Sequence, residues 1–127
     1  MTIAFWTILI AILMPWVLTG FVKTPAARQG RYNNSAPRSL VADLEGYSQR
    51  ANWAQENSFE ILPGYIAAVI VAHLAGADQS SIDSLAITFI VSRILFAICY
   101  LKDWATLRSL IWTVGVACMV GMFIISI

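Results

Sequence analysis

Residues 82–101 read IDSLAITFIVSRILFAICYL, an apolar run whose only charges are Asp83 near its start and Arg93 near its middle. About 20 mostly apolar residues in a helix cross the hydrocarbon core of a bilayer, which is about 30 Å thick. Residues 3–22, 59–77 and 104–127 form three further runs of this kind. Because the runs are continuous and lack the two-residue alternation of a membrane barrel, we expect an all-α integral membrane protein, a bundle of four transmembrane helices.

The composition of the whole chain supports a lipid environment. Of its 127 residues, 59% are hydrophobic and 12% are charged, whereas soluble domains are about 45–50% apolar and about 25% charged. A soluble domain of this length leaves too much surface in water to hide so much apolar area. We therefore expect one membrane domain, residues 1–127. Its first run lacks a basic leader and a small-residue cleavage site, so we expect a retained span.

Charge and residue counts argue against several functions. The net charge of +1 provides no basic excess for binding nucleic acid. One His and two Cys residues argue against a metal site built from these types. Cys99 and Cys118 lie inside apolar runs, so we expect buried free thiols.

The connections between the runs differ in positive charge, which predicts an orientation. Lys and Arg collect in the cytoplasmic connections of membrane proteins. The connection at residues 76–81 has neither residue, and the turn after residue 101 has Lys102. We therefore expect the first and third connections in the cytoplasm and both termini outside. Within the first connection, residues 23–53, we expect a short helical turn near residues 40–44; its cations are Lys23, Arg28, Arg31, Arg38 and Arg50.

A polar stripe runs into the second predicted helix. Arg50, Trp53, Asn57, Glu60 and Gly64 are spaced three and four residues apart in alternation, which places them on one side of a helix. Polar groups at membrane depth are costly unless they pair or line a wet cavity. The stripe is therefore a candidate binding surface.

The third and fourth predicted helices carry matching groups. Arg93 and Tyr100 are seven residues apart on one helix face, and Arg108 opens the last helix. Glu60 is a plausible counter-charge for Arg93, and such a pair could serve only to fix helix register. A ring of Arg50, Tyr100 and Arg108 goes beyond that need. It would suit an anionic, hydrogen-bonding ligand that enters from the cytoplasm.

Residues 49–63, QRANWAQENSFEILP, resemble the second-helix signature of the MAPEG family, the membrane-associated proteins in eicosanoid and glutathione metabolism. Asn57, Glu60 and Pro63 carry the match. Residues 37–46, PRSLVADLEG, are similar to the lead-in of bacterial members. With the later Arg, Tyr and Arg pattern, the resemblance covers nearly the whole chain.

The resemblance implies a homotrimer in a bacterial inner membrane, with glutathione bound between adjacent subunits and open to the cytoplasm. It implies that Arg108 stabilises the glutathione thiolate. The remaining partners would be membrane lipids and a lipophilic small molecule. The residues implied to bind glutathione or to support its site are Arg50, Asn57, Glu60, Arg93 and Tyr100.

Three functions follow from these residues. The first is a glutathione-dependent transferase or peroxidase acting on lipophilic electrophiles. The second is a non-catalytic membrane protein that binds a lipid, a small anion or a partner protein; Trp53 favours it, because catalytic members usually carry Arg at that position. The third, proton transfer along Glu60, Arg93 and His73, is disfavoured because His73 lies about 20 Å along the helix from Glu60. We expect His73 to be packed and hydrogen-bonded.

Overall fold

The computed structural model of the chain describes residues 1–127 as four long helices and one short helix. Each long helix is long and apolar enough to cross a membrane. The prediction of an all-helical fold with four such helices is therefore confirmed. The elements in chain order are α1 (Ile3–Arg28), the 3₁₀ helix η1 (Pro37–Asp43), α2 (Gly46–Leu74), α3 (Gln79–Leu101) and α4 (Ala105–Ile124).

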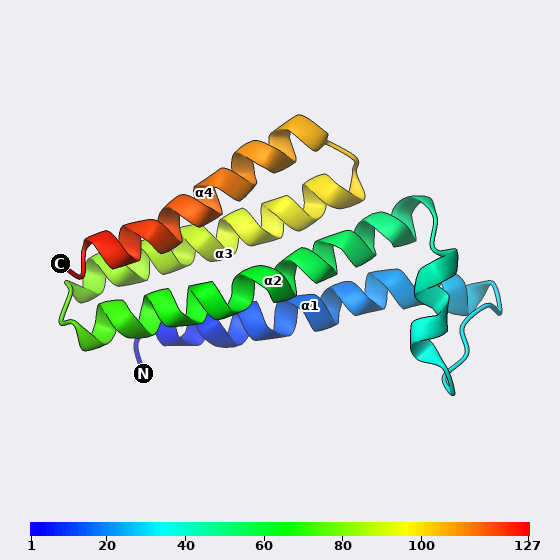
Figure 1. Cartoon of the computed structure of the whole chain (residues 1–127), viewed down its shortest axis with the longest axis horizontal. Helices are drawn as coiled ribbons and strands as arrows, with labels where there is room; N and C mark the ends of the chain where they lie inside the picture. The colour runs from blue at the N-terminus through cyan, green and yellow to red at the C-terminus, as the bar shows by residue number, and fades with distance from the viewer.

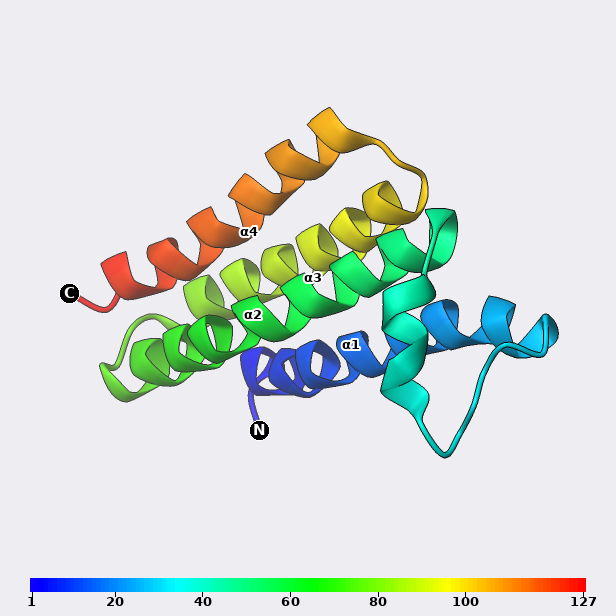
Figure 2. The same ribbon diagram turned by 45° about the vertical axis from the view of Figure 1, so that its right-hand side comes forward.

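The four long helices run roughly along one axis, with α1 beside α2 and α3 beside α4 (Figure 1). Helix α2 also packs on α3 and α4. Both termini lie at the end that carries the α2–α3 connection, and η1 crosses the opposite end (Figures 1 and 2). At the η1 end, the start of α4 stands apart from α2 (Figure 2).

The helices continue beyond the apolar runs of the sequence. Helix α1 extends to Arg28, and α2 begins at Gly46, so much of the polar segment 23–53 is helical. A helix satisfies its own backbone hydrogen bonds and can therefore leave the apolar layer intact. The expected short turn is present as η1, and its buried Leu40 packs with Val22 and Ala51.

The turn between α2 and α3 is short and well capped. Gly76 has a φ of 76°, a left-handed conformation that ends helices and that glycine adopts without steric cost. The Asp78 side chain then accepts a hydrogen bond from the Ser81 backbone N–H at 2.9 Å. This N-cap satisfies one of the free donors at the start of α3.

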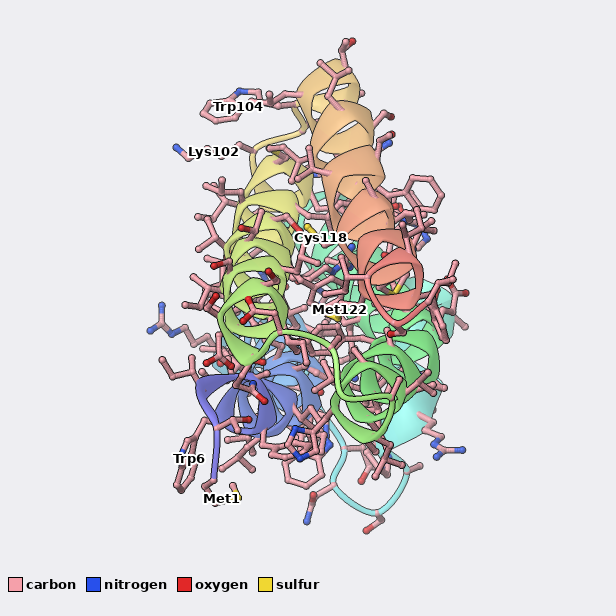
Figure 3. All side chains as sticks on the ribbon, turned by 90° about the vertical axis from the view of Figure 1, so that its left-hand side faces the viewer. Met1, Trp6, Lys102, Trp104, Cys118 and Met122 are labelled. Carbon is pink, nitrogen blue, oxygen red and sulfur yellow. The ribbon has the colours of Figure 1, made fainter.

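The centre of the bundle is packed with aromatic and small side chains. The rings of Tyr65 and Phe89 stack with centroids 3.8 Å apart, and the Tyr65 hydroxyl pairs with Thr7 on α1. Cys118 and Met122 point inward from α4 (Figure 3). The expected burial of Cys118 and of Cys99 as free thiols is confirmed.

Most large apolar side chains face outward instead. Trp16 and Val17 of α1 and Leu110 and Ile124 of α4 are each more than half exposed. An apolar exterior of this extent marks contact with lipid or with another protein surface. Lipid is the solvent that matches four helices of spanning length.

Candidate functional site

A cluster of cationic and aromatic side chains lies at the η1 end of the bundle, where α2 begins, α3 ends and α4 begins. We call Arg50, Trp53, Tyr100 and Arg108 the cation–aromatic cluster. The Arg108 guanidinium lies 4.2 Å from the Tyr100 ring centroid. The ring centroids of Trp53 and Tyr100 are 6.4 Å apart. Arg108 is half-buried and packs on an aromatic ring rather than on a carboxylate, so its charge remains available to an anion.

Arg50 supports this cluster from α2. Its Nη2 donates to the Leu101 carbonyl at 3.2 Å, one of the carbonyls that the end of α3 leaves unpaired. A cation at a helix C-terminus also interacts favourably with the helix dipole. Its Nε is buried without a partner. Arg50 therefore holds the end of α3, and with it Tyr100, against the start of α2.

A second polar group lies deeper in the bundle, and Arg93 is its centre. Arg93 is 2% exposed. Its Nη2 donates to Asn57 Oδ1 at 2.7 Å, and its guanidinium stacks 4.0 Å from the Phe96 ring centroid. Its Nη1 is buried without a partner. We call Asn57, Glu60 and Arg93 the Arg93 network.

The expected direct pairing of Glu60 with Arg93 is wrong. Asn57 lies between them, because its Nδ2 donates to Glu60 Oε2 at 3.4 Å while its Oδ1 accepts from Arg93. Asn57 precedes Glu60 by three residues on α2, and its side chain is the one that meets the buried guanidinium. The Glu60 carboxylate is exposed instead.

The Glu60 side chain lines a groove between α2 and α4. The groove has a volume of about 260 Å³. Asn57 and Glu60 are the polar groups that line it, and Trp112 and Met119 of α4 form part of its opposite wall. The groove does not reach Arg50, Tyr100 or Arg108. Within one chain, the predicted site residues therefore form two groups rather than one pocket.

Some contact residues of these groups were not predicted as site residues. Phe96 lies three residues after Arg93, and Trp112 lies four residues after Arg108. These spacings put each pair on one helix face, and they could have identified both aromatic residues. Met119 is one of many apolar residues in the run 104–127, so no spacing in the sequence identifies it as a groove residue. Its place in the groove depends on how α4 packs against α2.

Positive charge is strongly asymmetric along the bundle. Every Lys and Arg except Arg93 lies toward the η1 end, in the connections or in the adjoining helix turns. Lys102 and Trp104 project outward from the α3–α4 connection (Figure 3), with the ammonium 5.3 Å from the ring centroid. The opposite end carries Asp78 and Asp83. The η1 end also carries Asp43, Glu45 and Asp103, so its charge is a positive excess and not purely cationic.

His73 and Glu56 take no part in either group. His73 Nδ1 lies 3.0 Å from Gln79 Oε1, and the His73 ring meets the Phe5 ring edge-on at 4.8 Å. The expected hydrogen bond of His73 is therefore confirmed, but the side chain is exposed and packs only against the edge of Phe5. Glu56 accepts from Asn52 Nδ2 at 2.8 Å.

Comparison with known proteins matches the chain to one family. The model of the MAPEG family matches residues 3–127. The chain belongs to the MAPEG family. No curated protein and no solved structure matched the chain in the corresponding searches. As a MAPEG protein with four helices of spanning length, it is an integral membrane protein, and a glutathione-related or similar function at the membrane fits its family.

Proposed function

We propose that this MAPEG protein is a glutathione-dependent transferase or peroxidase acting on lipophilic electrophiles. The observation that carries the proposal is Arg108, a half-buried cation held over the Tyr100 ring without a carboxylate partner. A cation beside a thiol favours the thiolate, which is the nucleophilic form. Each unit by which the thiol pKa falls corresponds to about 1.4 kcal/mol. The Tyr100 phenol is a neutral donor to the same sulfur.

The other site residues have complementary roles in this proposal. The exposed Glu60 carboxylate would accept the glutathione ammonium. Asn57 would be a hydrogen-bonding partner oriented by Arg93, whose burial makes it a positioning residue. Arg50 would position Tyr100 through the end of α3. The hydrogen bonds of Arg50, Asn57 and Arg93 support the positioning roles in this proposal.

The two groups would be completed by a neighbouring subunit. The cation–aromatic cluster and the α2–α4 groove do not share a cavity within one chain, and α4 presents large apolar residues such as Leu110 to its surroundings. A homotrimer in which one chain supplies Arg108 and the next supplies Glu60 would join them. Its η1 end would face the cytoplasm, as the concentration of Lys and Arg there favours.

Turnover with glutathione tests the enzyme. The purified full-length protein in nanodiscs is assayed with a chloronitrobenzene and with a lipid hydroperoxide, and thiolate absorbance is followed on glutathione binding. Arg108→Met should lower kcat/KM by about 10–100-fold, since a charge-assisted contact contributes about 1.5–3 kcal/mol. Arg38→Met is the matched control, because Arg38 is an exposed cation on η1. Absence of turnover together with unchanged thiolate absorbance would contradict the proposed glutathione-dependent activity.

Trp53 favours the second function, a non-catalytic protein that binds a lipid, a small anion or a partner protein. Trp53 is 43% exposed beside Tyr100, where catalytic relatives usually present Arg to glutathione. Trp53→Arg discriminates between the two. If the wild type is inactive and the variant gains glutathione binding, the native site serves another ligand. If the wild type is active, Trp53 is compatible with catalysis and the second function fails.

A further inference from the structure

An apolar groove lies between α1 and α3, and its lining shares no residue with the proposed glutathione site. Its volume is about 370 Å³, and every lining residue is hydrophobic. From Ile10 to Phe21 on α1 it extends about 16 Å at the rise of an α-helix. One leaflet of a bilayer core is about 15 Å thick. The groove therefore has the length of an acyl chain that crosses one leaflet.

A more polar chamber continues this groove toward the η1 end. The chamber has a volume of about 650 Å³, and Val17 and Phe21 line both spaces. Its polar lining consists of Thr24, Arg28, Gln29 and Tyr47. Arg28 is seven residues beyond Phe21, or about 10 Å further along the axis. This distance puts the guanidinium at the depth of lipid headgroups.

The chamber selects for negative charge. Arg28 is the one charged residue that lines either space, and no carboxylate lines them. The neighbouring Arg31 does not line either space, but it lies beside the chamber, because its Nε donates to Gln29 Oε1 at 2.9 Å. The Gln29 amide nitrogen and the Tyr47 hydroxyl can still donate. An anion in the chamber would therefore meet the Arg28 cation and two neutral donors, with Arg31 as a second cation next to Gln29.

We propose that the groove and the chamber together bind one anionic phospholipid of the phosphatidylglycerol type. The phosphodiester would lie at Arg28, Gln29 and Tyr47. A volume of about 370 Å³ over about 16 Å gives a mean cross-section of about 23 Å², which accommodates one acyl chain; the second chain would remain in the bilayer. The chamber is far larger than a carboxylate, so a glycerophosphate headgroup fits it better than a fatty acid does.

This lipid site and the proposed enzyme site have different residues, although the Leu101 carbonyl at the end of the groove accepts from Arg50. None of its lining residues belongs to the cation–aromatic cluster or to the Arg93 network. Lipid binding can therefore be measured without glutathione, and its failure would leave the proposed activity open.

Native mass spectrometry tests the headgroup. The full-length protein is released from nanodiscs that contain equal amounts of phosphatidylglycerol and phosphatidylcholine with identical acyl chains. One retained phosphatidylglycerol per chain is expected, with a preference of about five-fold or more, as one cation at a membrane surface provides. Arg28→Gln should abolish the preference. Arg38→Gln, the matched control at an exposed cation that lines neither space, should keep it. Equal retention of both lipids, or equal loss in the two variants, overturns the proposal.

A second pair of variants tests the acyl chain. Ile94 lines the groove, whereas Ile87 is exposed on the same helix outside it. Ile94→Trp should remove the retained lipid, and Ile87→Trp should not. Displacement of phosphatidylglycerol by equimolar oleate would make a fatty acid the occupant and overturn the assignment. Efficient cross-linking between copies through Ile94→Cys would place a second copy in the groove and would also overturn it.

Discussion

Replacing Asn57 by leucine tests how much the hydrogen bond between Asn57 and the buried Arg93 stabilises the bundle. Arg93 is 2% exposed, and Asn57 Oδ1 is the acceptor of its Nη2 at 2.7 Å, while its Nη1 has no partner. A hydrogen bond to a charged group contributes about 1.5–3 kcal/mol, and its loss would leave the buried guanidinium without a side-chain acceptor. Because the guanidinium keeps its stacking on Phe96, we expect Asn57→Leu to lower the free energy of unfolding by about 2–3 kcal/mol.

Two further variants complete a double-mutant cycle. Arg93→Met with Asn57→Leu replaces both polar partners by apolar side chains, which is often close to neutral. The coupling energy should then be about 1.5–3 kcal/mol. The measurement is SDS-induced unfolding of the purified protein in mixed micelles, followed by circular dichroism. If Asn57→Leu stays within about 0.5 kcal/mol of the wild type and the coupling is near zero, the Arg93 network does not stabilise the fold as argued.

Further variants test the packing and the α3 cap. A Cβ added at Gly115 would lie 3.0 Å from Ser92 Oγ, so Gly115→Ala should destabilise the bundle by about 1–3 kcal/mol in the same unfolding assay. Gly20→Ala meets nothing within 4 Å and should stabilise the bundle by about 0.5–1 kcal/mol; the opposite order would contradict the packing described. Hydrogen bonds, first from the Ser80 hydroxyl, hold the pKa of Asp78 below 3.8. The cap is therefore present at neutral pH and weakens as the pH falls below about 4. Asp78→Asn should make this acid-induced loss of helix stability smaller, which hydrogen exchange at the start of α3 would detect.

The resemblance and the structure differ in what they establish about the site. Local spacing predicted the stripe that includes Asn57 and Glu60 on α2, and the Arg93 and Tyr100 positions on one side of α3. Helical periodicity is a property of neighbouring residues, so it can be read along the chain. Charge alone suggested Glu60 as the partner of Arg93. The way in which α2 and α3 pack instead made Asn57 the partner.

The sequence by itself determined the class of this protein. Four long apolar runs require helices that satisfy their own backbone hydrogen bonds in lipid, and the concentration of Lys and Arg in two connections predicts one orientation for them. Both properties are local, because each depends on residue type within a single segment.

Only the tertiary structure decided which helices meet and how each is rotated. It divided the predicted residues between the cation–aromatic cluster and the Arg93 network, and it brought Arg28 and Tyr47 to one chamber above the α1–α3 groove. Helix crossing and rotation depend on the packing of small residues such as Gly115 between helices. That packing joins segments far apart in the chain, so no pattern within one segment contains it.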